Sequence, residues 1–148
     1  MAWRHKVPPR AVIVSALALA LCVGVAGSAG SVLRVWLDAL LTPPARDDDA
    51  GKAHSWPVGT LAANVLGSLV MGLATALALA SGLPGDARTI VAVGFCGGLT
   101  TFSTFSVATF RLWESGRRGG AVGNILANVL LGVAAAGLGY WLGTLPPG

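Results

Sequence analysis

GTLAANVLGSLVMGLATALALASGLPG, residues 59–85, contains no Asp, Glu, Lys or Arg. A helix needs about 20 apolar residues to cross the hydrocarbon core of a bilayer, so this stretch predicts a transmembrane helix. Three further stretches, residues 11–33, 89–110 and 119–148, are equally free of these charges. The sequence therefore predicts an all-α membrane protein with four transmembrane helices, over about residues 11–36, 58–81, 88–112 and 120–142.

Composition also favours a membrane protein over a soluble one. Of the 148 residues, 54% are hydrophobic and 11% are charged, whereas a soluble domain carries roughly 25% charged residues. A soluble four-helix bundle would show polar faces at helical spacing, which these uncharged stretches lack. At this length the chain is predicted to form one domain, residues 1–148.

The ends of the predicted helices carry residues typical of a membrane interface. Basic residues flank the apolar stretches, which suits lipid headgroups better than nucleic acid, because a nucleic-acid surface needs a continuous basic patch. No nucleic-acid partner is therefore predicted. Tryptophans, which gather at the headgroup level of membrane proteins, lie at four of these ends: Trp36, Trp56, Trp113 and Trp141.

The first stretch allows a second interpretation. Arg4-His5-Lys6, an apolar run and the small residues 26–30 resemble a secretory signal with a cleavage site. The apolar run continues through Val32-Leu33 and meets Arg34 and Trp36, which favours a retained helix. Small residues that would let a neighbouring backbone approach this helix recur at every third position: Gly24, Gly27 and Gly30.

Basic residues are nearly balanced between the two sides of the membrane. The side with the N-terminus and the second loop carries four: Arg4, Lys6, Arg10 and Arg88. The side with the first and third loops carries six: Arg34, Arg46, Lys52, Arg111, Arg117 and Arg118. The positive-inside rule needs a clear excess to fix an orientation. Insertion in both orientations and a single orientation set by residues 111–118 both remain open on this count.

Uncharged polar side chains line two of the predicted helices. Polar groups in hydrocarbon are costly and need a reason. The second predicted helix has three polar side chains spaced four residues apart, Thr60, Asn64 and Ser68. The fourth has two at the same spacing, Asn124 and Asn128. Asparagine also bonds helices to one another, so these stripes predict either inter-helix contacts or a polar path. Amide and hydroxyl donors can solvate an anion without trapping it by a full opposite charge.

The stretch GGLTTFSTFS, residues 97–106, predicts an interruption of the third helix, because the glycine pair and five Ser or Thr residues are poor helix formers. An interruption frees backbone carbonyls, which must be buried in protein or bind a cation. A plain kink, with threonine hydroxyls bonding to the preceding turn, is the alternative. Phe102 and Phe105 share a face, where they either pack or turn their positively polarised edges toward an anion.

No catalytic or metal-binding pattern stands out, so the chain is not predicted to be an enzyme. There is no nucleophile–base pair. Cys22 and Cys96 lie inside apolar stretches without metal-ligand neighbours, which predicts buried, reduced thiols. His5 and His54 lie outside the apolar stretches and are interpreted as solvated loop residues.

In these motifs the sequence resembles the fluoride channels of the Fluc, or CrcB, type. The matching residues are 59–64 with Gly67, 94–106, and the glycine series that ends in Arg34, and the likeness extends over all four spans. It implies passive, selective export of fluoride across the bacterial inner membrane. It also implies an antiparallel, dual-topology dimer with two pores, whose second subunit is an identical copy or a paralogue.

The resemblance implies roles for particular residues. Asn64 would donate a hydrogen bond in the pore, and Phe102 and Phe105 would meet fluoride with their ring edges. Backbone carbonyls of Gly97 and Thr100 would help to hold a structural sodium ion at the dimer axis. The candidate pore set is therefore Asn64, Phe102, Phe105, Thr60, Ser68, Thr104, Asn124 and Asn128.

The chain departs from the family pattern in two ways. Ala108 takes the place of a glutamate that many members carry, so any gating or entry role of that carboxylate is in doubt here. Asn124 and Asn128 take the places of Tyr and Ser, but asparagine still donates hydrogen bonds, so the polar track is expected to persist.

Two other functions compete with a channel. A proton-coupled exporter of the small multidrug-resistance type also has four spans, but its chemistry needs a titratable carboxylate within the membrane, and the predicted spans have none. A non-conducting assembly subunit would explain the glycine-rich helices but not the aligned donors.

Overall fold

The computed structural model describes residues 9–42, 56–80 and 84–145, with side chains from residue 13 onward. Its helices are α1 (Pro9–Leu41), α2 (Val58–Ala80), α3 (Gly85–Thr89), the π-helix η2 (Ile90–Cys96), α4 (Gly97–Leu99), α5 (Phe102–Glu114) and α6 (Arg118–Gly143). Segments α3 to α5 follow one another as a single span. In this part of the chain four spans are long and apolar enough to cross a membrane, so the all-α, four-span prediction is confirmed.

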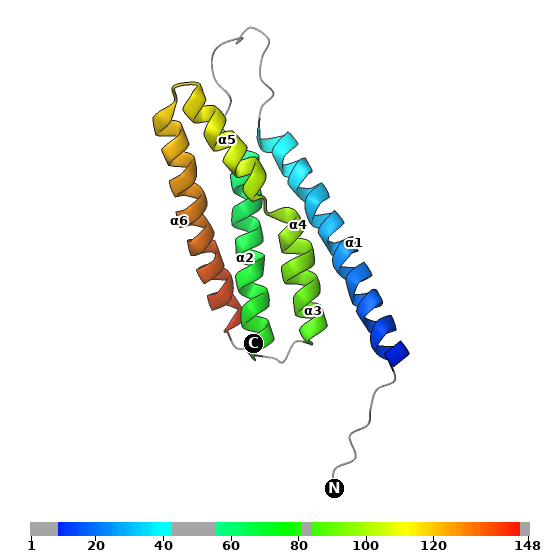
Figure 1. Cartoon of the computed structure of the whole chain (residues 1–148). Helices are drawn as coiled ribbons and strands as arrows, with labels where there is room; N and C mark the ends of the chain where they lie inside the picture. The colour runs from blue at the N-terminus through cyan, green and yellow to red at the C-terminus, as the bar shows by residue number, and fades with distance from the viewer. Residues whose placement is uncertain (1–8, 43–55, 81–83, 146–148) are drawn as a thin grey trace.

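The third span connects two sides of the molecule (Figure 1). In its first half, η2 and α4 pack against α1, and its second half, α5, packs against α6. Helix α2 lies between these two halves of the fold and makes its most extensive contact with α6. The change of side happens at the interruption between α4 and α5.

Glycines bring α1 close to the third span. A Cβ at Gly30 would overlap the carbonyl oxygen of Phe95, and a Cβ at Gly98 would overlap that of Gly27. Only hydrogen fits at such approaches, as small residues allow between transmembrane helices. The predicted contact is therefore confirmed for Gly27 and Gly30. It is wrong for Gly24, where a Cβ would meet nothing within 4 Å.

Glycines also let α2 and α6 approach closely, a contact that was not predicted from the sequence. A Cβ at Gly72 would overlap the carbonyl oxygen of Ala136, and a Cβ at Gly139 would overlap that of Leu69. The two backbones are therefore held together along the half of the molecule that lies away from the α4–α5 interruption. This close packing fixes α6 relative to α2, and these two helices carry the three asparagines.

The interruption lies at Thr100 and Thr101, whose backbones are extended at φ −79°, ψ 152° and φ −148°, ψ 120°. The predicted break within residues 97–106 is confirmed, but its cause is corrected. Gly97 and Gly98 remain helical, and Gly98 serves the close contact with α1. Thr101 caps the new helix, because its hydroxyl accepts a hydrogen bond from the N–H of Thr104 at 3.2 Å.

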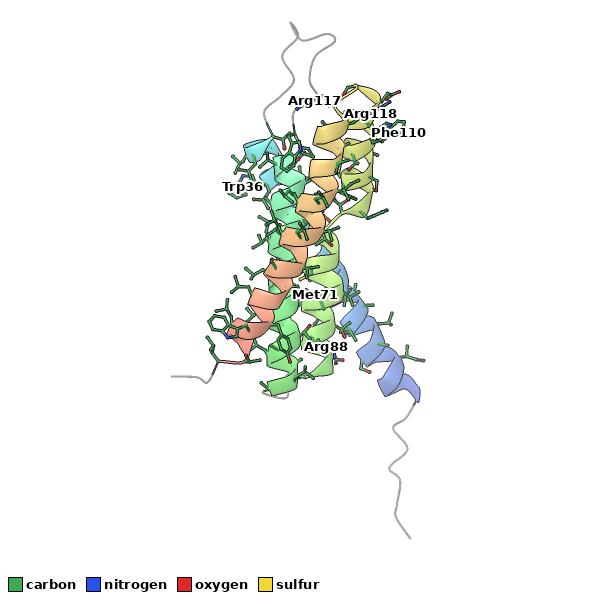
Figure 2. All side chains as sticks on the ribbon, turned by 90° about the vertical axis from the view of Figure 1, so that its left-hand side faces the viewer. Trp36, Met71, Arg88, Phe110, Arg117 and Arg118 are labelled. Carbon is green, nitrogen blue, oxygen red and sulfur yellow. The ribbon has the colours of Figure 1, made fainter. Side chains whose placement is uncertain are left out.

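Residues at the two ends of the molecule agree with a membrane interface. Trp36, Trp113 and Trp141 are more than half exposed, whereas Trp56 donates its indole N–H to the carbonyl of Gly120 at 3.3 Å. Figure 2 shows Trp36, Arg117 and Arg118 at one end of the molecule and Arg88 at the other.

Arg34 does not belong to the basic residues of a loop. It lies in α1 and turns inward, where its Nε donates to the carbonyl of Gly98 at 3.4 Å. Without Arg34, the side that held six basic residues holds five, against four. Five residues of that count lie outside the described side chains: Arg4, Lys6, Arg10, Arg46 and Lys52.

Helix α1 continues five residues past the predicted end at Trp36 and so includes Asp38. The Asp38 carboxylate accepts a hydrogen bond from the hydroxyl of Thr42 at 3.0 Å, and the same hydroxyl accepts one from the N–H of Gly59 at 3.2 Å. Asp38 therefore lies beside the start of α2, near a span end. An acidic group is favourable at a helix N-terminus.

Candidate functional site

Asn64 of α2 binds the extended backbone where the third span is interrupted. Its Oδ1 accepts a hydrogen bond from the N–H of Thr101 at 2.9 Å, and its Nδ2 lies 3.5 Å from the carbonyl oxygen of Thr101. In a continuous helix that N–H would have bonded to Gly97. Asn64 thus replaces the missing helical partner and holds the interruption open.

The three asparagines form one hydrogen-bonded chain. Asn64 donates from Nδ2 to Oδ1 of Asn128 at 2.8 Å. Asn128 donates from Nδ2 to the carbonyl and to Oδ1 of Asn124, at 2.9 and 3.1 Å. Asn124 donates from Nδ2 to the hydroxyl of Thr109 at 2.8 Å, and that hydroxyl donates to the carbonyl of Phe105 at 2.8 Å. We call this chain, from Thr101 to Phe105, the amide relay.

The amide relay joins α2, α6 and α5, and it contains every side-chain amide of the protein, because the sequence has three asparagines and no glutamine. Asn124 is completely buried. Buried amides without partners are costly, and fully satisfied networks fix a single arrangement. Among the described residues, no buried side-chain nitrogen or oxygen lacks a partner.

A pocket of about 320 Å³ opens where the relay meets the interruption. Its lining contains no ionisable group and consists of Asn64, Thr100, Thr101, Phe102, Phe105, Asn128 and Val129. The rings of Phe102 and Phe105 are 5.8 Å apart between centroids and are tilted by 48°. The pocket therefore combines amide groups with two aromatic rings in neutral surroundings.

Three other residues of the candidate set lie outside this pocket. Thr60 is buried on α2, one turn before Asn64. Ser68 faces α6, where its Oγ lies 3.5 Å from the position of a Cβ at Gly132. Thr104 is next to the pocket and accepts a hydrogen bond from the hydroxyl of Thr101 at 3.2 Å. The structure thus brings together Asn64, Asn128, Phe102 and Phe105, with Asn124 one step along the relay.

The comparison with known proteins identifies the family. Residues 21–140 match the family described as CrcB-like protein, Camphor Resistance (CrcB). The chain belongs to the CrcB-like family.

Several curated relatives share this likeness over most of their length. A protein of Renibacterium salmoninarum named "Fluoride-specific ion channel FluC" is 43% identical over 120 residues, which cover 81% of this chain and 94% of that protein. "Fluoride-specific ion channel FluC 1" of Leifsonia xyli subsp. xyli is 45% identical over 125 residues, covering 84% and 86%. "Fluoride-specific ion channel FluC 2" of Mycobacterium bovis is 39% identical over 130 residues, covering 86% and 94%.

The interruption in this CrcB-like chain takes the helical N–H donors away from four carbonyls, those of residues 97 to 100. The N–H of Thr101 would reach Gly97, but it bonds to Asn64. The N–H of Thr104 would reach Thr100, but it bonds to the hydroxyl of Thr101. A third carbonyl, that of Gly98, accepts from Ser31 at 3.3 Å and from Arg34. The carbonyls of Gly97 and Thr100 are thus among those whose helical donors bond elsewhere.

Sequence reasoning missed three contributors to the site. Thr101 was considered as part of a poor helix or of a kink in which its hydroxyl bonds to the preceding turn, but its N–H bonds to Asn64 and its hydroxyl caps the following helix. Thr109 was not singled out, because a lone threonine in an apolar stretch usually bonds to its own helix. Ser31 of α1 has no signal in the sequence that would have paired it with a carbonyl 67 residues away.

Proposed function

We propose that this CrcB-like protein is a passive, fluoride-selective channel that exports fluoride and lowers its cytoplasmic concentration. The observation that carries the proposal is the neutral pocket at the interruption, where Asn64, Asn128 and two phenylalanine rings meet. The printed names of the relatives, fluoride-specific ion channels, support the same function for this chain.

The chemistry of the pocket suits a small anion. Fluoride is strongly hydrated, so a pore must replace lost water with other donors. An amide N–H supplies a donor without a positive charge, so that the ion binds and also leaves. The edges of aromatic rings carry partial positive charge, and the tilt between Phe102 and Phe105 prevents the two faces from stacking flat. No lining group of this pocket titrates, so conduction is not coupled to a proton there.

The competing exporter finds no support in the structure. Proton-coupled export needs a carboxylate inside the membrane. Among the described residues, the three carboxylates lie within four residues of a span end: Asp38 in α1, Asp86 in α3 and Glu114 in α5. Transport by this chain is therefore passive in the proposal, and no catalysed reaction is assigned to it.

The function is tested with the purified full-length chain in liposomes loaded with potassium fluoride. Efflux is followed with a fluoride electrode after valinomycin is added to carry the compensating potassium. Fluoride release above that of protein-free liposomes, without a proton gradient, is the expected result. Equal release of chloride in parallel liposomes would refute selectivity, and dependence on an imposed proton gradient would favour the exporter.

The proposal includes a dimer. Gly97 and Ser103 are exposed beside the interruption, and Phe102 is 80% exposed. The Ser103 hydroxyl has a partner in Thr101, but a backbone carbonyl without its helical donor faces lipid only at a large cost, so in the proposal a second protein surface covers this region. An identical copy or a paralogue fulfils this, and the names FluC 1 and FluC 2 among the relatives are consistent with paralogues.

Within that dimer, the proposed arrangement is antiparallel. Nearly equal numbers of basic residues on the two sides permit insertion in either orientation. Two-fold symmetry would place the interruption of one subunit against that of the other. Crosslinking of the purified, singly expressed chain tests whether it pairs with itself, and accessibility labelling at Arg117→Cys from both sides of the bacterial inner membrane tests the dual orientation.

A structural sodium ion is proposed at the dimer axis, where it would hold the two subunits together. The carbonyls of Gly97 and Thr100 fit such an ion, because their helical donors bond elsewhere. Backbone oxygens are the ligands that alkali cations accept in membrane proteins. Among the described residues no cluster of His, Cys, Asp or Glu is available to bind a metal instead. The ion would supply only positive charge and cohesion at the axis.

A further inference from the structure

The hydroxyl of Thr109 has a fixed direction. Its single hydrogen is donated to the carbonyl of Phe105, four residues earlier, at 2.8 Å. A hydroxyl has one donor and two acceptor lone pairs, so toward Asn124 it offers an acceptor. The Asn124 amide therefore presents Nδ2 to Thr109, at 2.8 Å, and turns Oδ1 the other way.

This direction passes along the amide relay. Because Oδ1 of Asn124 faces Asn128, the Asn128 amide turns its Nδ2 toward it, at 3.1 Å, and toward the Asn124 carbonyl, at 2.9 Å. Both hydrogens of Asn128 are then used on the α6 side. Its Oδ1 faces the pocket and accepts from Asn64 at 2.8 Å.

The opposite end of the relay enforces the same direction independently. The N–H of Thr101 is only a donor, and it reaches Oδ1 of Asn64 at 2.9 Å. Asn64 must therefore turn Nδ2 toward Asn128, which is what the α6 side also requires. A flipped amide anywhere between Thr101 and Thr109 would set donor against donor or acceptor against acceptor.

The direction decides which atoms meet an anion in the pocket. Asn128 shows an acceptor, and both of its hydrogens are bonded. Asn64 keeps one hydrogen that is held only by the 3.5 Å approach to the Thr101 carbonyl, at the long limit of hydrogen bonding. We propose that Thr109 is a positioning residue: together with the Thr101 N–H at the other end, it fixes the direction of the amide relay in which Asn64 is the pocket's anion donor. This inference rests on the proposed fluoride conduction.

Removing the Thr109 hydroxyl without changing the volume of the side chain isolates this role. In Thr109→Val, Nδ2 of Asn124 loses its acceptor in a fully buried position. Reversing the Asn124 and Asn128 amides would give Nδ2 of Asn124 a new acceptor. It would also turn the N–H groups of Asn128 against those of Asn64. With the relay reversed, Asn64 loses the acceptor that Asn128 offers, and we expect fluoride efflux to fall by at least about fivefold, the change in rate that about 1 kcal/mol at the top of the fluoride barrier represents.

Two further variants separate direction from packing. Thr109→Ser keeps the hydroxyl and is expected to restore efflux to within about twofold of the wild type. Thr75→Val is the matched control, because the Thr75 hydroxyl makes the same bond to its own helix, to the Met71 carbonyl at 2.8 Å, and belongs to no relay. Its efflux is expected to equal that of the wild type.

A second measurement reads the relay without any ion flux. With three asparagines and no glutamine, the ¹⁵N–¹H spectrum of the detergent-solubilised protein contains three pairs of side-chain amide signals. In Thr109→Val we expect the Asn64 pair to shift, although Asn64 bonds to neither Thr109 nor Asn124, while Thr109→Ser and Thr75→Val leave it in place.

The outcomes are distinct. Wild-type efflux and an unshifted Asn64 pair in Thr109→Val would overturn the inference, and so would a loss of efflux that Thr109→Ser fails to restore. Wild-type protein that releases no fluoride would overturn the proposed function instead, and the amide spectra would still decide whether Thr109 directs the relay.

Discussion

Replacing Asn64 with alanine removes the residue that serves both the interruption and the pocket. Asn64→Ala deletes the acceptor of the Thr101 N–H, at 2.9 Å, and the donor to Asn128, at 2.8 Å. It also deletes the loosely held hydrogen that we assign to the anion. We expect fluoride efflux to fall severely while the proposed dimer still forms.

The magnitude follows from the partners that are left behind. A polar group that loses its partner in a buried site costs about 1–3 kcal/mol. If fluoride loses one such donor at the top of its barrier, a cost of about 1–3 kcal/mol corresponds to a rate about 5- to 150-fold lower. The Thr101 N–H left unpaired adds a similar cost to the folded state, so the melting temperature should fall as well.

Asn64→Asp keeps the bond to the interruption but removes the donor. An ionised carboxylate still accepts from the Thr101 N–H, but it donates nothing, repels an anion and faces the Oδ1 acceptor of Asn128, so efflux should fall. A protonated carboxyl regains one O–H donor, so efflux should recover partly as the pH falls toward the pKa of the carboxyl, which is about 3.9 for an unperturbed aspartate. The wild type should stay flat over the same fall in pH, since no residue lining the pocket titrates.

The assay is electrode-detected efflux from liposomes, with protein-free liposomes subtracting the leak of undissociated acid at each pH. Size-exclusion chromatography of each variant confirms that the oligomer survives. Wild-type efflux from a well-folded Asn64→Ala protein would refute the reasoning and leave Asn64 as an inter-helix contact only.

Three further predictions concern packing and the ion. Gly30→Ala should destabilise the detergent-solubilised protein by about 1–3 kcal/mol, because its Cβ would overlap the Phe95 carbonyl, and equal melting temperatures for it and the unhindered Gly24→Ala would contradict the close α1 contact. Gly116→Ala should cost about 1–2 kcal/mol, because Gly116 has φ +80°, and Gly119→Ala, where a Cβ meets nothing, is the control in the same thermal assay. Replacing sodium with a large organic cation should stop fluoride efflux without changing the preference for fluoride over chloride, and undiminished efflux would remove the case for a structural ion.

The four spans could be predicted because each is a long stretch without charge, and hydrocarbon tolerates little else. Their ends could not be predicted as well. Helix α1 continues through Asp38, whose carboxylate accepts from the Thr42 hydroxyl, and that hydroxyl accepts from the Gly59 N–H at the start of α2. Gly59 belongs to a second helix, and no local pattern around Asp38 predicts this contact.

The interruption of the third span was predicted within residues 97–106 and lies there, but the sequence did not single out the extended residues. Intrinsic propensity marked Gly97-Gly98 together with the Ser and Thr residues, yet these two glycines stay helical, and α1 packs against Gly98. The extended residues are Thr100 and Thr101, where Asn64 replaces the helical acceptor from 37 residues away. Tertiary contacts override intrinsic helix propensity here, and they decide at which residues the third span is interrupted.

The polar stripes were only partly informative about the site. Spacing alone placed Thr60, Asn64 and Ser68 on one face of α2, yet only Asn64 lines the pocket. Four residues of helix rise about 6 Å, so a shared face extends well beyond a pocket that holds one small ion. The Asn64–Asn128 contact depends on the register of α2 against α6, which the Gly72 and Gly139 contacts fix.

The interruption explains why one subunit presents both a pocket and an unfinished surface. Where the helix stops, the N–H groups of Thr101 and Thr104 find partners within the subunit. The carbonyls of Gly97 and Thr100 lose their helical donors at the same step. Donors are thereby concentrated on the relay side, next to the proposed anion path, and acceptors are left for the proposed cation. The single interruption thus places backbone N–H donors beside the proposed anion path and backbone carbonyl acceptors beside the proposed cation site. This separation explains how an anion channel could depend on a cation for its assembly.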